Sequence, residues 1–252
     1  MMEFILTEVA ERIRGLRDMM DITPEEMAEV TGVPLEEYLA CENGEKDFSF
    51  TFLYKCAVRF GVDMTELKKL REQLKSEDIK VSYTDILVKV VAVALTEFPL
   101  LNCSVEDNKI IYKHYVNMGV AVALDNGLVV PNVPDADKKS LTEISAEVKE
   151  LATLARKGGL PMDRLTGGTF TITNLGMYGI ESFSPIINQP EVAILGVNTM
   201  EDKVVVVDGE ICVRPIMNLS LTADHRVIDG SVAAQFLQRV KKLMEKPALL
   251  LA

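Results

Sequence analysis

The spacing of apolar residues predicts a run of short helices over residues 1–62. A helix should start at Thr23–Glu26, where threonine can cap, proline suits the first position and two acids follow. Val33-Pro34 starts another helix, which Asn43-Gly44 ends. Residues 49–60 should form one more helix, closed by Gly61. The first quarter of the chain is therefore predicted to be a small all-α domain.

The pattern changes beyond residue 80. Residues 63–80 are highly charged and predict a helical connector, whereas Tyr83–Phe98 is apolar all round and predicts a buried helix. Asp208-Gly209 is a two-residue turn that favours a hairpin. Strands are expected at 109–115, 118–124, 128–133, 169–173, 192–197, 203–207, 210–214 and 216–222, and amphipathic helices at 140–155 and 232–244. This mixture indicates an α/β sandwich with a mixed sheet.

Composition narrows the classes of function. The net charge of −11 and the pI near 4.8 argue against general binding to nucleic acid or to an anionic membrane surface. The four cysteines are scattered without metal-binding spacing, which suits reduced thiols and predicts no metal site. No stretch has the character of a signal peptide or a membrane-spanning helix. These features predict a soluble cytoplasmic protein.

The chain has two histidines, and they stand in different surroundings. His114 lies beside Lys113 and Tyr115 in an alternating strand, which is typical of a surface or structural residue. His225 follows the predicted strand 216–222 and lies in the loop Asp224–Gly230 before a helix. Loops held by a rigid scaffold often carry catalytic groups, and imidazole can take up a proton near neutral pH. His225 is therefore the candidate general base.

Several ordered motifs resemble one family. They are His-Arg-Val-Ile-Asp-Gly at 225–230, Phe-Thr-Ile-Thr-Asn-Leu-Gly at 170–176, the segment Pro185–Val197, Gly-Leu-Val-Val-Pro at 127–131 and Asp-Lys-Lys-Ser-Leu at 137–141. Together they resemble the catalytic domain of the dihydrolipoyl acyltransferases of the 2-oxo-acid dehydrogenase complexes. The resemblance spans about 170 residues and implies a fold like that of chloramphenicol acetyltransferase.

The resemblance also implies roles for residues. His225 would deprotonate the thiol of coenzyme A or of dihydrolipoamide, Thr173 would bind the oxyanion, and Asp229 would hold the histidine loop through an ion pair. The implied residues around the substrate channel are Asn174, Gly176 and Asn188. The lipoyl group would come from another domain or protein, and the other components of a 2-oxo-acid dehydrogenase complex are further implied partners. The implied assembly is a homo-oligomer, most readily a trimer, with its active sites shared between subunits.

The N-terminal helices resemble the lambda-repressor-like helix-turn-helix family over residues 7–67. The segments that carry this resemblance are 13–17, 23–28, 32–33 and 42–44. The expected recognition helix, however, presents Glu36 and Glu37, and residues 1–62 contain 13 acids and 6 bases. Acidic groups repel DNA phosphates, so DNA is a doubtful partner. A small helical interaction domain remains the other interpretation.

The two resemblances predict a helix-turn-helix domain at 1–62, a connector at 63–80 and a partial acyltransferase domain at 81–252. The family's first helix and strand, including the expected arginine partner of Asp229, should be missing. An acyltransferase is thus one interpretation, and a DNA-binding or regulatory protein with an inactive acyltransferase-like domain is the alternative. Asp229–Ala234 resembles acetyl-transferring members more than succinyl-transferring ones, with branched-chain acyl groups as the second choice.

Overall fold

The computed structural model describes residues 10–11, 14–15, 17–18, 23–31, 34–43, 45, 58–106, 109–124, 127–207 and 209–251. In the N-terminal region it contains the helices α2 (Pro24–Thr31) and α3 (Leu35–Glu42). The predicted start of α2 is confirmed, because the Thr23 amide donates to Glu26 at 2.8 Å and the Glu26 amide donates to the Thr23 hydroxyl at 3.2 Å. This reciprocal pair is a capping box.

A buried carboxylate organises the small core of this region. Glu42 is 3% exposed and accepts hydrogen bonds from Tyr38 Oη at 2.6 Å and Arg17 Nε at 2.7 Å. Ala10, Ala28 and Cys41 pack around Tyr38. Because the charge of Glu42 is paired and hydrogen-bonded, its burial is tolerated.

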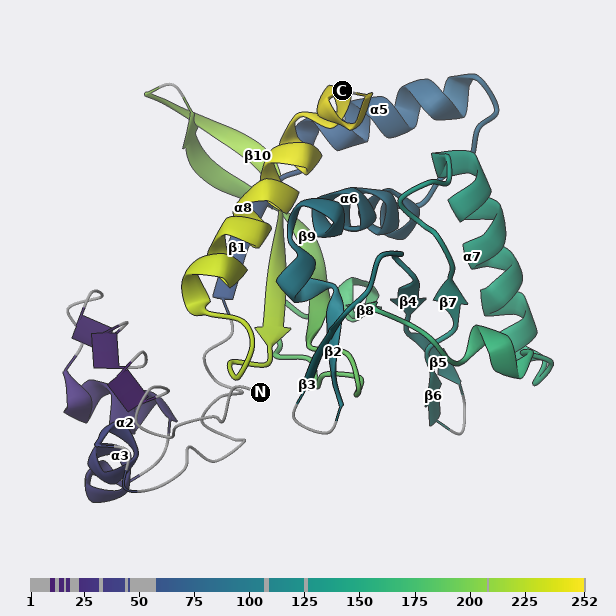
Figure 1. Cartoon of the computed structure of the whole chain (residues 1–252). Helices are drawn as coiled ribbons and strands as arrows, with labels where there is room; N and C mark the ends of the chain where they lie inside the picture. The colour runs from purple at the N-terminus through teal and green to yellow at the C-terminus, as the bar shows by residue number, and fades with distance from the viewer. Residues whose placement is uncertain are drawn as a thin grey trace.

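The larger part of the chain is built on one mixed sheet of six strands (Figure 1). The strand order is β1-β10-β9-β8-β4-β7; β9, β8 and β4 run parallel, and the other neighbours pair antiparallel. The bounds are β1 Val58–Asp63, β4 Met118–Val120, β7 Asn132–Val133, β8 Phe170–Asn174, β9 Ala193–Val207 and β10 Glu210–Ala223. The predicted α/β fold with a mixed sheet is therefore confirmed.

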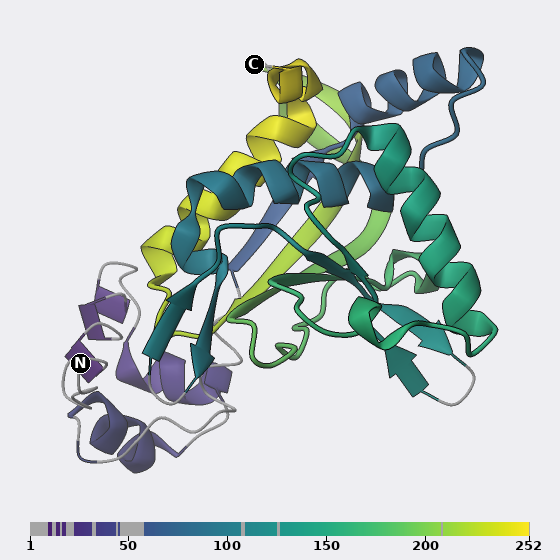
Figure 2. The same ribbon diagram turned by 45° about the vertical axis from the view of Figure 1, so that its right-hand side comes forward.

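Four helices accompany this sheet, and α6 and α8 lie against its face (Figures 1 and 2). They are α5 (Thr65–Ser76), α6 (Tyr83–Glu97), α7 (Leu141–Arg156) and α8 (Gly230–Glu245). Phe236 of α8 packs on Phe170 of β8 with ring centroids 5.7 Å apart, and on Phe98 with centroids 5.6 Å apart. The even-numbered side chains of β8 therefore point toward the helices.

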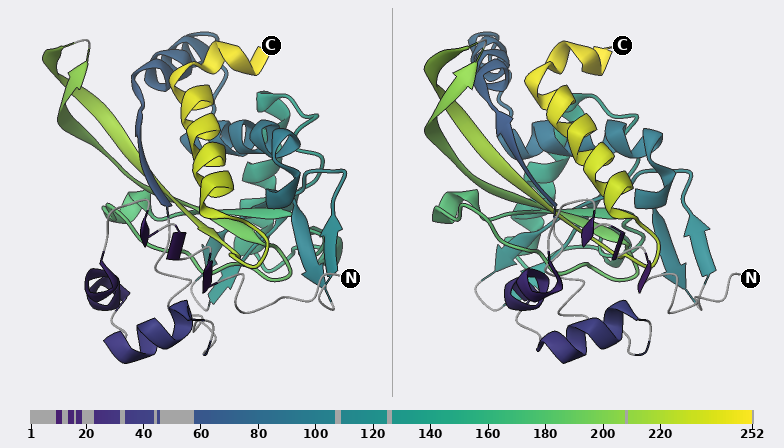
Figure 3. Two further views of the ribbon diagram at one scale, coloured as in Figure 1. Left: turned by 60° about the vertical axis from the view of Figure 1, so that its left-hand side comes forward. Right: turned by 90° about the vertical axis from the view of Figure 1, so that its left-hand side faces the viewer.

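The remaining elements are short. Two small sheets pair β2 (Cys103–Glu106) with β3 (Lys109–Tyr112), and β5 (Val122–Leu124) with β6 (Gly127–Val129). Single 3₁₀ turns are η1 (Pro99–Leu101), η2 (Met162–Arg164), η3 (Gly176–Tyr178) and η4 (Pro247–Leu251). The outer halves of β9 and β10 form a two-stranded arm that projects beyond the sheet (Figure 3).

The structure corrects the prediction at residues 49–63. A helix was expected to reach Phe60, but residues 58–63 form strand β1, paired antiparallel with residues 216–221 of β10. Residues 49–57 lie outside the described part of the chain. The expectation that the sheet lacks its first strand is therefore wrong, and the sheet includes residues before the boundary expected at 62/63. This strand also carries an arginine, Arg59.

Candidate active site

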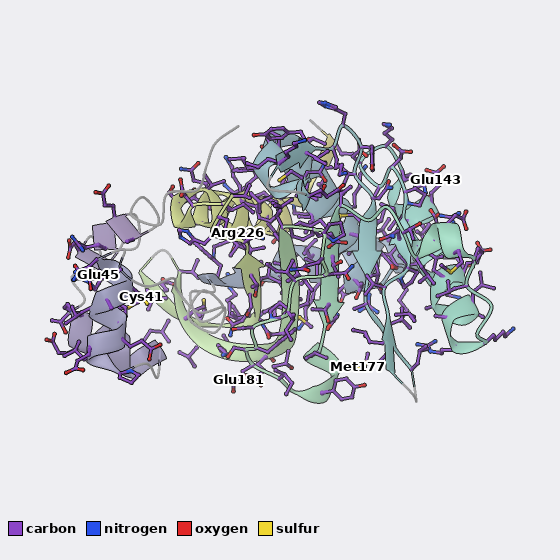
Figure 4. All side chains as sticks on the ribbon, turned by 60° about the horizontal axis from the view of Figure 1, so that its bottom comes forward. Cys41, Glu45, Glu143, Met177, Glu181 and Arg226 are labelled. Atoms are coloured by element: carbon purple, nitrogen blue, oxygen red, sulfur yellow. The ribbon has the colours of Figure 1, made fainter. Side chains whose placement is uncertain are left out.

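The loop between β10 and α8 holds His225. Backbone hydrogen bonds fix this loop: the Asp224 amide donates to Val192 O at 2.7 Å, and the Ile228 amide donates to Asp224 O at 3.0 Å. Arg226, labelled in Figure 4, folds back onto the Asp224 carboxylate with Nε–O distances of 2.9 and 3.0 Å. Since Ile228 is also buried, the loop is a constrained turn.

His225 itself is half-buried, with one ring nitrogen shielded from solvent. Its Nδ1 is buried and has no hydrogen-bonding partner in the structure. Four residues on, Asp229 is the N-cap residue of α8, and the Ala233 amide donates to its carbonyl oxygen at 3.0 Å. The Asp229 side chain makes no capping hydrogen bond to the helix. The loop is thus held at both ends by its backbone, with the imidazole between them.

Thr173 lies on β8, which runs through the middle of the sheet. It is level with Gly196 of β9, and Gly196 is level with Ser220 of β10. Thr173 shares the face of the sheet opposite the helices, where a Cβ on Gly196 would meet the Phe183 ring at 3.0 Å. Segment 175–191 therefore crosses this face, with Met177 and Glu181 marked on it in Figure 4.

The sheet register separates Thr173 from the His225 loop. Thr173 is aligned across the sheet with Ser220 of β10, and β10 ends three residues later at Ala223. Strands β8 and β10 are two strand spacings apart, because β9 lies between them. At roughly 3.3 Å per residue and 4.8 Å per strand, Thr173 and Ala223 are about 14 Å apart. One chain therefore does not bring the two predicted catalytic side chains into contact through the sheet.

Asn174 and Gly176 close the end of β8. Asn174 Nδ2 donates to the Thr84 hydroxyl of α6 at 3.1 Å, and its Oδ1 accepts from the Gly176 amide at 2.9 Å. A Cβ on Gly176 would lie 2.6 Å from the backbone oxygen of Asn198, so only glycine fits there. Both residues shape the strand end, and Asn174 points to the face opposite Thr173.

Asn188 is also engaged with the protein. Its Nδ2 donates to Glu191 Oε1 at 3.2 Å and lies 3.5 Å from the Thr171 hydroxyl. Glu191 belongs to the motif Pro185–Val197, which by itself assigns this residue no role. The structure shows it 4% exposed, accepting a 2.6 Å hydrogen bond from Thr171. Burial raises its pKa to about 7, against the lowering effect of the bonds from Thr171 and Asn188.

The described residues contain no cluster of three or more side chains suited to hold a metal ion. Within the same residues, no helix combines the length and apolar character needed to cross a membrane.

Comparison with known families decides what this domain is. The family model for the 2-oxoacid dehydrogenases acyltransferase catalytic domain matches residues 53–252. The chain belongs to this acyltransferase family. Its match begins before β1, in agreement with the place of that strand in the sheet. A second model, described as helix-turn-helix, matches residues 13–67, a range of which only parts are described in the structure.

Relatives in the acyltransferase family carry two acyl specificities. The succinyltransferase component of the 2-oxoglutarate dehydrogenase complex of Bartonella vinsonii subsp. berkhoffii is 45% identical over 191 residues, covering 74% of this chain and 46% of that protein. The acetyltransferase component of the pyruvate dehydrogenase complex of Bacillus subtilis is 45% identical over 196 residues, covering 75% and 44%. The chain thus spans less than half the length of these two relatives.

Solved structures confirm the fold. A dihydrolipoamide acetyltransferase of Azotobacter vinelandii superposes with a TM-score of 0.75 and 38% identity, covering 78% of this chain and 83% of that one. Chloramphenicol acetyltransferase superposes with a TM-score of 0.51 at 14% identity, which supports the shared fold alone. The predicted chloramphenicol acetyltransferase-like architecture is therefore correct.

Proposed function

We propose that the chain is an acyltransferase that moves an acyl group between dihydrolipoamide and coenzyme A, with His225 as general base. One observation carries the proposal. The study of the Azotobacter enzyme names a serine, a histidine and an asparagine in its catalytic mechanism, at positions 52 residues apart and then 4 residues apart. Thr173, His225 and Asp229 have the same two spacings. The hydroxyl and the imidazole are retained, and aspartate takes the place of asparagine.

His225 would act on the attacking thiol. Its imidazole takes the thiol proton, the thiolate attacks the thioester carbonyl, and a tetrahedral intermediate with an oxyanion forms. The intermediate collapses by breaking the original carbon–sulfur bond, and the departing thiolate receives the proton from His225. Such general-base assistance is typically worth roughly 10²–10⁴-fold. The buried Nδ1 leaves Nε2 as the nitrogen that can exchange this proton with a substrate.

Thr173 would stabilise the oxyanion. No hydrogen bond to its hydroxyl occurs among the described residues, so the hydroxyl can donate to a substrate oxygen. One such donor is worth about 10²–10³-fold. Because the sheet places Thr173 about 14 Å from the start of the His225 loop within one chain, we infer that a site combines His225 of one subunit with Thr173 of another. Asp229 would stabilise the loop, and Asn174, Gly176 and Asn188 would shape the channel walls.

We further propose a homotrimer that receives its lipoyl group from a separate domain or protein. The projecting arm supports self-association. It exposes Val204, Val206, Ile211 and Val213, each between 64 and 79% exposed. Val206 pairs with Ile211 and Val204 with Val213, so the four side chains share one face. An apolar stripe of this kind is typical of a surface that becomes covered.

The acyl group is proposed to be acetyl, because the residues that follow Gly230 at the start of α8 are uncharged and resemble those of acetyl-transferring members. The direct test measures acyl transfer from acetyl-CoA and from succinyl-CoA to dihydrolipoamide by release of coenzyme A. Faster transfer of acetyl supports the proposal. A preference for succinyl-CoA would correct only the proposed acyl group. Absence of transfer from either donor at saturating concentrations would refute the proposed acyltransferase activity.

We propose that the helix-turn-helix-like region is an interaction module and not a DNA reader. Glu36 is exposed on α3, the helix that would have to enter the major groove. The first turn of α3 contains the two acids Glu36 and Glu37, and its last turn contains no basic residue.

A further inference from the structure

The buried carboxyl of Glu191 has no basic partner. None of the ion pairs found among the described residues involves it, and it is 4% exposed. An unpaired ionised carboxylate is costly to bury, so the neutral acid is the form that fits this environment. Its partners, the Thr171 hydroxyl and the Asn188 amide, both donate to it. A neutral acid has one proton still to give.

Asn132 on β7 supplies the missing acceptor. Its Nδ2 donates to Thr166 O at 3.1 Å, and since a carbonyl oxygen can only accept, this fixes the orientation of the amide. Its Oδ1 is buried and has no hydrogen-bonding partner. A buried acceptor without a donor costs about 1–3 kcal/mol.

Gly168 brings Asn132 and Glu191 together. A Cβ on Gly168 would lie 2.5 Å from Asn132 Oδ1 and 2.8 Å from Glu191 Oε1, so these two oxygens are no more than about 5.3 Å apart. Two acceptor oxygens this close repel one another, unless one of them carries a proton. A protonated Glu191 could donate to Asn132 Oδ1 after a small shift or through one water.

This cluster touches the elements that form the proposed site. Thr171 is on the same strand and the same face as Thr173, two residues away. Asn188 and Glu191 lie at the end of segment 175–191, which covers that face. The Asn188 carbonyl also accepts from the Glu191 amide at 3.1 Å, which closes the turn.

Resting on the function proposed above, we propose that Glu191 is a positioning residue of the acyl-transfer site. As a neutral acid it ties Thr171, Asn188 and Asn132 into one network, which fixes turn 188–191 against the strand that carries Thr173. Ionisation removes the proton that Asn132 Oδ1 needs, and the turn is released.

The pKa of Glu191 is shifted by burial and by the hydrogen bonds from Thr171 and Asn188, and no charged group of the described residues contributes to the shift. The groups that face Glu191 from β8, from its own turn and from β7 are the uncharged Thr171, Asn188 and Asn132. On adjoining segments, Ser104 of β2 donates to the Glu106 carboxylate at 2.8 Å, and the Asp224 backbone amide donates to Val192 O at 2.7 Å. The cations there are already paired with these acids, Lys113 with Glu106 at 3.8 Å and Arg226 with Asp224 at 2.9 Å.

The decisive variant is Glu191→Gln. Glutamine has nearly the same shape and stays neutral at every pH, and its amide can donate to Asn132 Oδ1 while its oxygen accepts from Thr171. It loses only the longer hydrogen bond from Asn188. Glu181→Gln is the matched control, because Glu181 is an exposed glutamate on the same segment.

Two measurements are made on the whole protein between about pH 6 and pH 8, on either side of the titration. The first is hydrogen exchange of peptides that cover residues 185–192, corrected for the intrinsic rate. In the parent and in Glu181→Gln, exchange should rise about threefold or more with pH, and in Glu191→Gln it should stay level. The second is the pH profile of kcat and KM: the parent should lose kcat on the alkaline side, whereas Glu191→Gln should keep kcat within about fivefold and lack that decline.

Exchange that is independent of pH in the parent would overturn the proposal. Loss of most of the activity in Glu191→Gln at acid pH would also overturn it, because Glu191 of the parent is itself neutral there. Absence of acyl transfer in all three proteins would reject the proposed function alone. The exchange measurement would then still decide whether Glu191 fixes its turn.

Discussion

His225 is the general base of the proposed mechanism. Replacement by alanine should lower kcat at least 100-fold, about the lower limit of general-base assistance, while the circular dichroism spectrum stays that of the parent. The control is His114→Ala, because His114 is exposed and lies outside the proposed site. Activity of His225→Ala within a few-fold of the parent would remove His225 from the mechanism.

Glu191 should also make stability depend on pH. Its folded-state pKa of about 7 lies above the ordinary value of 4.5, so the folded protein holds this proton more tightly than the unfolded chain. The contribution is complete below about pH 4.5 and is lost as the pH rises through about 7, and it amounts to about 3 kcal/mol at most. Urea unfolding of the parent and of Glu191→Gln should therefore show a free-energy difference that changes across this range and levels off above it. A constant difference would contradict a buried neutral acid.

Strand β1 is the element that changes most between sequence and structure. Val62 is fully buried, and Val62→Ala should lower the free energy of unfolding by about 2 kcal/mol, through lost methyl groups and the cavity that they leave. Lys69→Ala, on the exposed face of α5, should stay within about 0.5 kcal/mol of the parent. Thermal or urea unfolding measures both. Equal stability of the two variants would mean that β1 does not belong to the cooperative unit.

Long patterns were predictable and short or ambiguous ones were not. The apolar run Tyr83–Phe98 predicts a buried helix, and α6 spans Tyr83–Glu97 with nine of its residues buried. Residues 58–63 alternate apolar and polar positions as a strand does, but Gly61 at this place also favours the end of a helix. Their true partner, β10, lies about 160 residues away, and local spacing contains no information about it.

The same limit applies to the candidate site. Residues on one loop, such as His225 and Asp229, could be recognised from a contiguous motif. The network of Glu191 joins β7, β8 and a turn, and the sequence shows only that an acid stands in an apolar segment. That acid, directly before the strand 192–197, was the signal that could have identified it.

At the scale of the whole molecule, self-association should depend on the arm of β9 and β10. Val206→Glu combined with Ile211→Glu places two like charges across one strand pair, so the assembly should dissociate. Specific activity should fall with it, because the two halves of a site would be separated. Met162→Glu, equally exposed on η2, is the control. Sedimentation over a concentration series measures the mass, and a monomer with full specific activity would exclude a shared site.

The acidic balance of residues 1–62 predicts the behaviour of the whole chain toward DNA. Residues 1–62 contain 13 acids and 6 bases, so the region repels DNA more than its basic side chains can neutralise DNA phosphates. Fluorescence anisotropy with selected duplexes at physiological salt should detect no sequence-specific complex. A dissociation constant tighter than about 10⁻⁷ M for one sequence over others would establish DNA recognition instead.

The position of β1 has a consequence for synthesis on the ribosome. Its register partners in β10 are residues 216–221, so this edge of the sheet cannot close until nearly the whole chain has emerged. In contrast, the contacts of Arg17 and Tyr38 with Glu42 join residues at most 25 positions apart and can form early. The nascent chain would therefore fold its two parts in succession, with the unpaired strand β1 as the segment that most needs protection by a chaperone.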